Sequence, residues 1–555
     1  MLMIGNSAYA YNFKSGGIYY NILSETNLTA EVTSGDEKYS GDITIPSEVT
    51  DGSQKYKITA IGDKAFFQCE EMNSINLPIT LTTIGEYTFS YCIGLKSVTL
   101  PESVSYIKYS AFSHCSGLTS FTFPEKISEI GHGILSYCSS LKSVSIPNNV
   151  KSIGTTAFSY CTNLEAIIIP DVVTSIGASA FEHCSKLESV TIGKSVETIG
   201  QAAFGDCGLL NTVIIPESVT TINNFAFAEC SSLSSINIPK NVSTIGYNPF
   251  RGCNSLNVID VSPENINYVS EEGILYTKDY STLISCPGGK KGEISINSAT
   301  ETIGDSAFSD CTTLNKVELP SGVENINTNA FWNCTGLKSI DLPESLSTIG
   351  NAAFRGCEAL ETISIPQSVT SIEDNTFSGC SALKVVNFPD NITSIGSQAF
   401  SMCNSLKEVR FPSSINRIGN LALLGCYSLT SIYCGWETPL ECNPDISTTV
   451  LNNAVLYVPK GSVSKYREVS PWNKFTHIEE MVSTGVENTI GDKAIAKISI
   501  DNGVIKVEGI SYDTEIIAYD MQGRVVYSGT EKTISNLAHG SYIIKAGKAT
   551  AKLSI

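Results

Sequence analysis

Apolar positions return along this chain at a fixed interval of 23 residues. Cysteine marks the interval most clearly, since 15 of the 18 cysteines occupy one position of the period. A run of nine extends from Cys69 to Cys253, and after a break a run of six extends from Cys311 to Cys426. A fixed period between about 20 and 50 residues is the signature of a solenoid, in which each copy forms one coil.

Four other columns accompany these 15 ladder cysteines. Isoleucine stands eight residues before every one of them, and phenylalanine stands three residues before 13 of them. Leucine follows three residues later in 14 copies, and proline follows nine residues later in 12. The same few positions are therefore apolar in every copy, which predicts a continuous core running through the stacked coils.

The copy from Cys92 to Cys115 shows what one coil contains. The stretch from Leu95 to Leu100 ends with Val98, Thr99 and Leu100, which alternate between apolar and polar. This alternation is the period of a half-buried strand. Proline cannot donate a ladder hydrogen bond, so the strand ends before the next residue, Pro101. The Ala-Phe-x-x-Cys segment that closes the copy is long enough for one helical or 3₁₀ turn.

A corner is expected directly after the invariant isoleucine. The next residue is glycine in 11 copies and asparagine in two, and both tolerate a positive φ angle. Lys108 and Glu373 depart from this rule, and we expect the chain to be strained or differently turned there.

The ladder cysteines admit three interpretations. Equivalent cysteines on adjacent coils would lie within disulfide range, although an odd number of identical positions does not suggest pairs. One cysteine per coil without a histidine column is not the spacing of a zinc site. The favoured interpretation is a small buried hydrophobic residue. Three cysteines lie off the ladder, namely Cys286, Cys434 and Cys442. A local disulfide between Cys434 and Cys442 is an alternative to free thiols at these two positions.

The repeat I-P-x-x-V-x-x-I-G-x-x-A-F-x-x-C-x-x-L-x-x-I resembles the BspA-type (treponemal-type) leucine-rich repeat over residues 41–480. This resemblance implies a right-handed, β-rich β/α superhelix of about 17 coils, a leucine-rich-repeat solenoid. The repeat of this sequence differs from ordinary leucine-rich repeats because it has no asparagine ladder after the strand. We expect an N-terminal β cap at residues 11–40, an inserted hairpin at about 262–293 and a C-terminal cap at 450–480.

The two ends of the chain differ from the repeats. Ala8-Tyr9-Ala10 follows a short apolar stretch, and we interpret residues 1–10 as the remnant of a signal peptide. Residues 485–555 lack the period and alternate like strands, which predicts a small β-sandwich. Their Asp-x-x-Gly-Arg turn and Gly-x-Tyr-Ile-Ile strand are similar to the sorting domain of type IX secretion substrates in Gram-negative bacteria. An ordinary β-sandwich without a sorting role is the alternative.

Composition and charge exclude several classes of protein. The net charge is −19, and because residues 485–555 contain eight acids and eight bases, all of it lies in the preceding part. Sparse lysine and arginine argue against nucleic-acid binding, since phosphate contacts dominate that affinity. No apolar stretch is long enough to span a membrane as a helix. The chain has five histidines and no common catalytic motif, so we predict no enzymatic activity, no cofactor and no metal.

One candidate binding site stands out in the column just before the ladder cysteine. Five successive coils carry an aromatic or imidazole ring there, at Tyr91, His114, Tyr137, Tyr160 and His183. Stacked coils would place these rings in a row along one flank. Such a row suits sugar faces or an extended peptide, and a purely structural stack of rings is the alternative.

The resemblance implies an extracellular or cell-surface binding protein, often an adhesin, with no catalytic residues to transfer. We therefore expect a protein secreted or displayed on the outer surface of a Gram-negative bacterium, where it contacts host or microbial proteins or glycans. A structural spacer or coat protein without a specific ligand, and a glycan-capture accessory protein, are the alternatives.

Overall fold

The computed structural model describes residues 11–481 and, beyond them, residues 497–501, 504–508, 516–520, 525–529, 532–534, 541–546 and 549–554. The chain divides into two compact units, Met1–Glu480 and Met481–Ile555. The expected signal-peptide remnant at residues 1–10 lies outside the described residues. Within the described part of the chain, no helix is long and apolar enough to cross a membrane.

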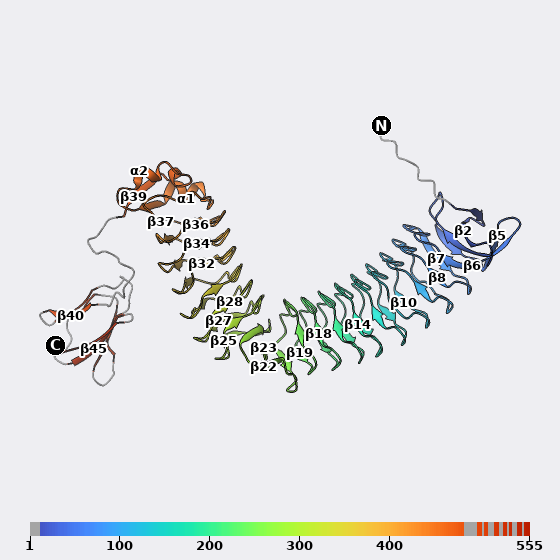
Figure 1. Cartoon of the computed structure of the whole chain (residues 1–555), viewed down its shortest axis with the longest axis horizontal. Helices are drawn as coiled ribbons and strands as arrows, with labels where there is room; N and C mark the ends of the chain where they lie inside the picture. Colours follow the sequence, from blue (N-terminus) through green and yellow to red (C-terminus); the bar gives the residue numbers. More distant parts are fainter. Residues whose placement is uncertain are drawn as a thin grey trace. The chain divides into compact units, whose positions relative to one another are not determined.

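The first unit is the predicted solenoid, with about 18 turns of about 23 residues each and almost entirely β structure. Its coils stack in chain order (Figure 1). One side of each coil, which we call the strand face, carries a short strand that pairs in parallel with the strand 23 residues further on, as Ser189 does with Thr212. The strands of this face are β4 (Gly41–Thr44), β7 (Met72–Asn76), β10 (Ser120–Thr122), β11 (Ser143–Ser145), β13 (Ala166–Ile168), β15 (Ser189–Thr191), β17 (Thr212–Ile214), β19 (Ser235–Ile238), β21 (Val258–Val261), β25 (Gly292–Ser295), β27 (Leu314–Glu318), β29 (Ser339–Ile340), β31 (Thr362–Ser364), β33 (Val385–Asn387), β35 (Glu408–Phe411), β37 (Ser431–Cys434), β38 (Val455–Val458) and β39 (His477–Glu480).

A second side of each coil, which we call the flank, carries a two-residue strand that ends at the invariant isoleucine. The strands of the flank are β8 (Thr83–Ile84), β9 (Tyr106–Ile107), β12 (Ser152–Ile153), β14 (Ser175–Ile176), β16 (Thr198–Ile199), β18 (Thr221–Ile222), β20 (Thr244–Ile245), β26 (Thr302–Ile303), β28 (Asn325–Ile326), β30 (Thr348–Ile349), β32 (Ser371–Ile372), β34 (Ser394–Ile395) and β36 (Arg417–Ile418). In the copy that starts at Cys92, residues 95–100 form no regular strand, although Leu95 and Leu100 are buried as predicted.

Strands β1 (Phe13–Ser15), β2 (Ile18–Ser24), β3 (Thr29–Thr33), β5 (Glu48–Thr50) and β6 (Lys55–Ile61) cover the first coil. They join β8 and β9 in one seven-stranded sheet. Because β6 is parallel to both β3 and β8, the cap continues directly into the flank ladder.

An insertion separates the two blocks of repeats. It contains the antiparallel strands β22 (Tyr268–Glu271), β23 (Ile274–Thr277) and β24 (Thr282–Ser285), and β24 then pairs in parallel with β26. Side chains on either side of the insertion still meet. Arg251 Nε lies 3.1 Å from Asp310 Oδ2, and Ser306 Oγ lies 2.9 Å from the hydroxyl of Tyr247. The insertion therefore interrupts the sequence period but leaves the two blocks in contact.

The last coil is covered by short helices. These are α1 (Thr448–Asn453), α2 (Val463–Tyr466) and the 3₁₀ helix η1 (Trp472–Lys474). Trp472 is fully buried, and its indole Nε1 donates to the carbonyl of Leu440 at 2.8 Å. A large ring with a satisfied polar group thus closes the core.

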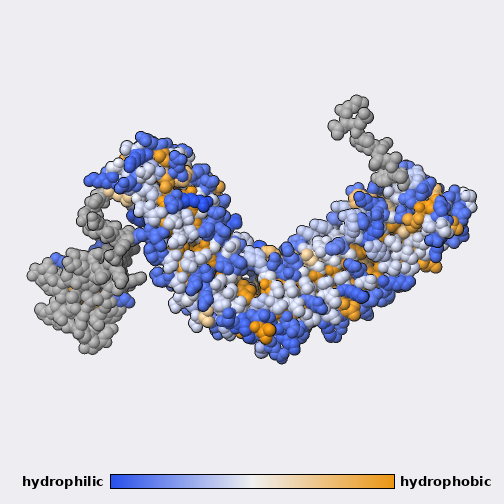
Figure 2. All heavy atoms as spheres, in the orientation of Figure 1, coloured by the Kyte–Doolittle hydropathy of each residue, from blue (hydrophilic) through white to orange (hydrophobic). Residues whose placement is uncertain are grey.

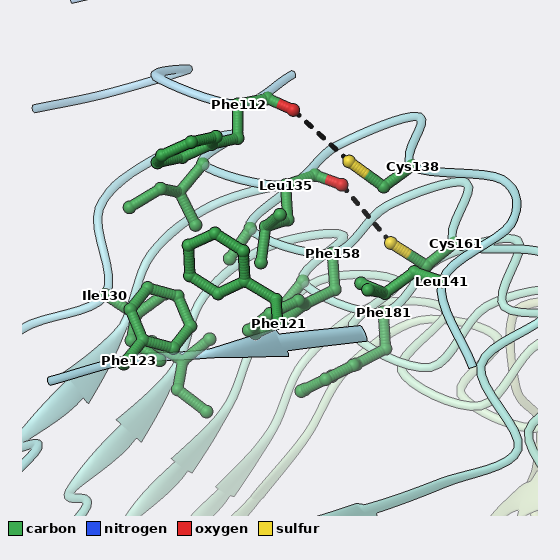
Figure 3. Close-up of a cluster of buried hydrophobic side chains, with 14 of the residues drawn as sticks. Phe112, Phe121, Phe123, Ile130, Leu135, Cys138, Leu141, Phe158, Cys161 and Phe181 are labelled. Atoms are coloured by element: carbon green, nitrogen blue, oxygen red, sulfur yellow. Dashed lines mark hydrogen bonds between the residues drawn. The ribbon is translucent and has the colours of Figure 1, made fainter. Parts of the chain in front are cut away.

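The core consists of the predicted columns. Phenylalanine rings of successive coils stack on one another, as Phe158 does on Phe181, and Leu135 takes the place of a ring between Phe112 and Phe158 (Figure 3). All 18 cysteines are free thiols, and every ladder cysteine is buried, so no Cys434–Cys442 disulfide forms. The thiols also have a role that the sequence does not predict. Cys138 Sγ donates to the carbonyl of Phe112, and Cys161 Sγ donates to that of Leu135, each at 3.2 Å. Thirteen ladder cysteines bond in this way to the preceding coil, at 3.0–3.3 Å.

The remaining side of each coil is built of turns rather than of the expected helical or 3₁₀ turn. In one coil, the N–H groups of Phe67 and Cys69 donate to carbonyls three residues earlier. The N–H groups of Phe66 and Gln68, which alternate with them, donate to the next coil instead. Half of the donors are thus used between coils, which a continuous helix would not allow.

The corner glycines serve a different purpose from the one predicted. None of the glycines after the invariant isoleucine has a positive φ. A Cβ atom on Gly154 would instead come within 2.8 Å of the backbone carbon of Gly131 in the preceding coil. The prediction of a left-handed corner is therefore wrong, and the glycine is needed because adjacent backbones approach closely. Lys108 and Glu373 likewise have no positive φ.

The second unit, described by itself, contains two antiparallel sheets. One has the order β40 (Lys497–Asp501), β41 (Val504–Glu508), β44 (Thr533–Ile534). The other has the order β43 (Val525–Gly529), β42 (Ile516–Asp520), β45 (Ser541–Ala546), β46 (Ala549–Ser554). Each sheet buries apolar side chains, such as Ile505 in the first and Ile516 in the second. The Asp-x-x-Gly-Arg turn at residues 520–524 lies largely outside the described residues.

Candidate functional site

The structure brings all five predicted ring residues together in one continuous stack, which we call the ring row. The row runs along the turns in the order Tyr91, His114, Tyr137, Tyr160, His183, with successive ring centroids 4.1, 4.4, 4.4 and 4.2 Å apart. The first three pairs are within 15° of parallel, and the last is tilted by 33°. The repeat spacing, close to that of adjacent strands, sets this separation.

The stacking decides which parts of the rings remain accessible. Each inner ring has a neighbour on both faces, so its edge and its polar tip face outward. Tyr91 and Tyr137 are 37% and 43% exposed, and the other three rings are partly buried. The row therefore presents a stripe of ring edges with the tyrosine hydroxyl groups along it. Its inner rings do not present the free faces on which a sugar would stack.

The backbone beneath the row is strained. All five residues have a left-handed conformation, with φ between +59° and +63°. The same position is left-handed in all 15 copies of the repeat. Glycine occupies it in only four copies, and residues such as Gln68, Glu229 and Met402 occupy it in others. A left-handed conformation costs a residue with a side chain about 1–2 kcal/mol.

Stacking does not clearly offset this strain. A contact between aromatic rings contributes about 0.5–1.5 kcal/mol beyond its buried area. The four contacts of the row thus contribute about 2–6 kcal/mol, whereas five strained residues cost about 5–10 kcal/mol. The strain is a feature of every coil, so what distinguishes these five coils is the stack of rings that they carry at this position.

His114 is the electrostatically distinct member of the row. Its Nδ1 atom is buried and has no hydrogen-bond partner. Burial between Tyr91 and Tyr137 lowers the pKa of His114. Burial thus favours the uncharged imidazole, which lies in the stack as its second ring.

Charged groups lie at both ends of the row. Before Tyr91, Phe67 packs edge-on at 5.9 Å, and the ammonium of Lys38 lies 5.5 Å from the ring centre of Phe67. After His183, the Nδ1 atom of that residue lies 3.5 Å from Asp206 Oδ2. The row thus runs from a basic end to an acidic end.

Glu182 joins His183 and Asp206 to form a group of three potential metal ligands. Their ligand atoms lie within 4.8 Å of one another, and all three residues are partly exposed. No other such group occurs among the described residues. Exposed acidic groups often gather in this way without an ion, so we regard the three residues as the acidic end of the ring row.

Two side-chain clusters were not predicted from the sequence. On the strand face, Tyr433 and Tyr457 stack with centroids 4.5 Å apart, and the guanidinium of Arg410 lies 3.6 Å from the ring centre of Tyr433. Beside the insertion, Arg251 lies 4.8 Å from the ring centre of Trp332 as well as beside Asp310. The first cluster could have been found from the sequence, because its members are 23 or 24 residues apart. The second joins residues on either side of the break in the period and gives no such signal.

Apolar residues on the visible face of the solenoid form small separate patches among hydrophilic residues (Figure 2). The largest exposed members are single isoleucines, such as Ile79 and Ile214, each 83% exposed. Scattered apolar residues of this kind are normal on a soluble surface. The ring row is therefore more distinctive than any apolar patch.

Comparison with protein families and solved structures places this geometry in context. A family model described as BspA type leucine rich repeat region matches residues 59–188, 174–282, 290–385 and 347–438. A leucine rich cell surface protein from Faecalibacterium prausnitzii is 27% identical, with 77% of this chain and 95% of that chain covered and a TM-score of 0.48. A leucine-rich repeat protein from Bacteroides ovatus is 26% identical, with 85% and 100% covered and a TM-score of 0.45. No curated protein matches this chain significantly.

Proposed function

Because the chain belongs to the BspA-type leucine-rich repeat family, we propose that it is a non-enzymatic, adhesin-like protein of the bacterial cell surface that binds another protein through the ring row. The observation that carries this proposal is the continuous stack of five partly exposed rings. The rings occupy a position that other coils fill with glycine, methionine or polar residues, and their edges face outward.

The geometry of the row favours a protein partner over a glycan at this site. Sugars bind to aromatic residues mainly through free ring faces, and the neighbouring rings occupy these faces. Ring edges and tyrosine hydroxyl groups instead suit the mixed apolar and polar contacts of a protein interface, in which tyrosine is enriched.

The length and charge of the row describe the partner further. Four coil steps separate Tyr91 from His183, which is about 19 Å at strand spacing. An extended segment of about six residues has this length. With Lys38 before the row and Asp206 after it, a segment that is acidic at one end and basic at the other would complement both ends.

Binding to purified extracellular-matrix proteins tests the proposal. Collagen, laminin and fibronectin would be immobilised, and the binding of the wild-type chain would be compared with that of a Tyr137→Ala/Tyr160→Ala variant. Tyr457→Ala is the matched control, since it removes a stacked tyrosine outside the row. We expect at least one protein to bind, and we expect only the double variant to lose that binding at an unchanged melting temperature.

Two results would contradict the proposal. Equal binding by the double variant and the wild type would show that the ring row does not contact the partner. The structural spacer would be favoured instead if the chain bound none of the three proteins and tolerated the deletion of one whole 23-residue coil.

We also propose that residues 485–555 direct export, as their resemblance to sorting domains suggests. Deleting them should leave the solenoid folded, because the two units are separate compact bodies. The truncated chain should then accumulate inside the cells of a type IX secretion host. Unchanged surface display would contradict the sorting role and leave the solenoid assignment intact.

A further inference from the structure

A gap opens in the flank between two consecutive coils. Within residues 11–481, no backbone hydrogen bond joins residues 105–108 to residues 128–131. One step further on, the ladder is intact, since Lys151 N–H donates to Ser128 at 2.9 Å and Gly154 N–H donates to Ile130 at 2.8 Å. The N–H groups of Ser128 and Gly131 therefore lack the partners that their counterparts have in the next coil.

The distance between the two backbones confirms the gap. A Cβ atom built on Gly131 would lie 3.8 Å from the carbonyl oxygen of Ile107. The corresponding distance is 2.9 Å from Gly154 to the oxygen of Ile130 in the next step. The coils on either side of the gap are therefore separated on the flank but still joined on the turns, where Ser110 N–H donates to His132 at 2.9 Å.

The gap contains a cavity of about 210 Å³, which we call the flank cavity. The cavity is lined by residues 105–109, 127–129, 131 and 132. Sites for drug-sized ligands measure about 300–1,000 Å³, so this volume suits a smaller ligand. It also excludes an added β-strand, because inserting one would require the two coils to be about 9.6 Å apart.

Two exposed tyrosines stand at the cavity. Tyr106 is 59% exposed and Tyr109 is 42% exposed. Tyr109 is held in place on its outer side. Its ring packs edge-to-face with Tyr87 at 5.4 Å, and its hydroxyl group forms a hydrogen bond with Glu86 that raises the pKa of Tyr109 to about 12. Tyr106 has no such ring contact within the described residues, and more than half of its surface is exposed.

The charges around the cavity argue against an ionic ligand. Lys108 Nζ lies 3.1 Å from Asp63 Oδ1 and is neutralised by that carboxylate. Glu129 also lines the cavity and would repel an anion. A cation would meet only this single carboxylate, without a second acid in the lining. A neutral ligand fits the lining best.

We propose that the flank cavity binds one neutral monosaccharide unit, either free or at the end of a glycan. A pyranose presents an apolar face that packs on a tyrosine ring, as well as hydroxyl groups that both donate and accept hydrogen bonds. The cavity supplies matching groups, namely the N–H groups of Ser128 and Gly131 and the carbonyl groups of Ser105 and Ile107. This site is distinct from the ring row, and the proposal does not depend on the protein partner proposed there.

A second break in the flank ladder provides an internal comparison. In the described solenoid, no β-pairing joins β30 to β32, where Glu373 replaces the corner glycine. The residues there are Thr348, Ile349, Ser371 and Ile372, without an aromatic ring. A broken ladder alone therefore does not supply an aromatic ring, whereas the first break combines a cavity with exposed tyrosines.

Ligand-observed NMR on the full chain tests the proposal. The probes are the methyl glycosides of glucose, galactose, mannose and N-acetylglucosamine, and an array that carries the same sugars as glycan termini distinguishes free from terminal units. We expect at least one probe to bind the wild type, and we expect Tyr106→Ala to weaken that binding at least tenfold. Tyr137→Ala, in the ring row, should leave sugar binding unchanged.

Tyr106→Ala should fold normally because the side chain is more than half exposed, and its melting curve verifies this. Tyr109→Phe is the second variant, since it keeps the ring but removes the hydroxyl group that holds it against Glu86; we expect a smaller loss of sugar binding. The proposal is overturned if no glycoside binds the wild type, or if binding is equally strong in folded Tyr106→Ala. Loss of matrix-protein binding in the ring-row variants would leave this result unaffected, so the two proposals fail separately.

Discussion

The thiol of Cys161 donates a hydrogen bond to the backbone carbonyl of Leu135 in the preceding coil, at a distance of 3.2 Å from Sγ to oxygen. Both groups are buried, so water cannot replace either partner. The same bond recurs along both blocks of repeats, which explains why the column contains cysteine rather than alanine or valine. The position requires a small apolar side chain that can also donate a hydrogen bond.

Removing one of these thiols should therefore destabilise the solenoid. Cys161→Ala removes one of the two hydrogen bonds to the carbonyl of Leu135, which still accepts the N–H of Cys138 at 3.2 Å. We expect a loss of about 0.5–1.5 kcal/mol for the bond, in addition to the small cavity. Urea unfolding followed by circular dichroism measures the loss. Cys442→Ala is the control, because Cys442 is only partly buried and lies off the ladder; we expect a change within about 0.5 kcal/mol. Equal effects of the two substitutions would argue against the bond.

Stability should also fall at alkaline pH. Burial raises the pKa of Cys115, Cys161, Cys253 and Cys426 to about 12, whereas an unfolded thiol titrates near 9. The folded state keeps these protons above pH 9 and the unfolded state releases them, so the thiols favour unfolding as the pH rises from 9 to 12. Each thiol contributes up to about 1.4 kcal/mol per pH unit. Unfolding free energies that are constant between pH 8 and pH 10.5 would contradict this account.

A methyl group at the flank corner should disturb the stacking of the coils. Gly177→Ala places a Cβ atom within 2.6 Å of the backbone carbon of Gly154, so the two coils must separate. We expect a loss of about 1–3 kcal/mol, as for overpacking in a core. Gly322→Ala is the matched control, since its nearest neighbour would be 3.9 Å away. The control should be neutral or slightly stabilising, and thermal unfolding distinguishes the two.

The contact between the two blocks of repeats should depend on Arg251. Its guanidinium lies beside Glu229 and Asp310, and Asp310 is only 9% exposed. Arg251→Ala leaves that carboxylate poorly compensated, and hydrogen bonds to charged groups contribute about 1.5–3 kcal/mol. Lys194→Ala breaks an exposed pair with Asp171 and should cost less than about 1 kcal/mol. Limited proteolysis near the insertion would reveal any separation of the blocks, and equal resistance of both variants would exclude this coupling.

The sequence predicts the repeats well because each coil depends on the same buried columns. The ring row follows directly from one column, since residues 23 positions apart must lie side by side. The left-handed positions could not be predicted, because they hold tyrosine, histidine, lysine and phenylalanine in some coils and glycine in others. A conserved corner glycine has two physical explanations, a positive φ or a close backbone neighbour, and only the structure distinguishes them.

The flank cavity and the contact between the two blocks were beyond prediction for a related reason. Both depend on small departures from the regular stack, at Lys108 and at the insertion before Cys311. A periodic pattern describes what all coils share, and a break in one column does not by itself tell whether two coils separate there or how far. The breaks in the corner column, at Lys108 and Glu373, lie beside the two gaps in the flank ladder.

The central claim is that the ring row is retained for contact with a partner rather than for stability. The free energy of unfolding of Tyr137→Gly tests it most directly, because glycine relieves the strain of a residue whose φ is +61°. The account predicts that this variant is as stable as the wild type to within about 1 kcal/mol, and more stable than Tyr137→Ala, which keeps the strain. A loss of more than about 3 kcal/mol in Tyr137→Gly, the full value of its two ring contacts, would show that the row is structural.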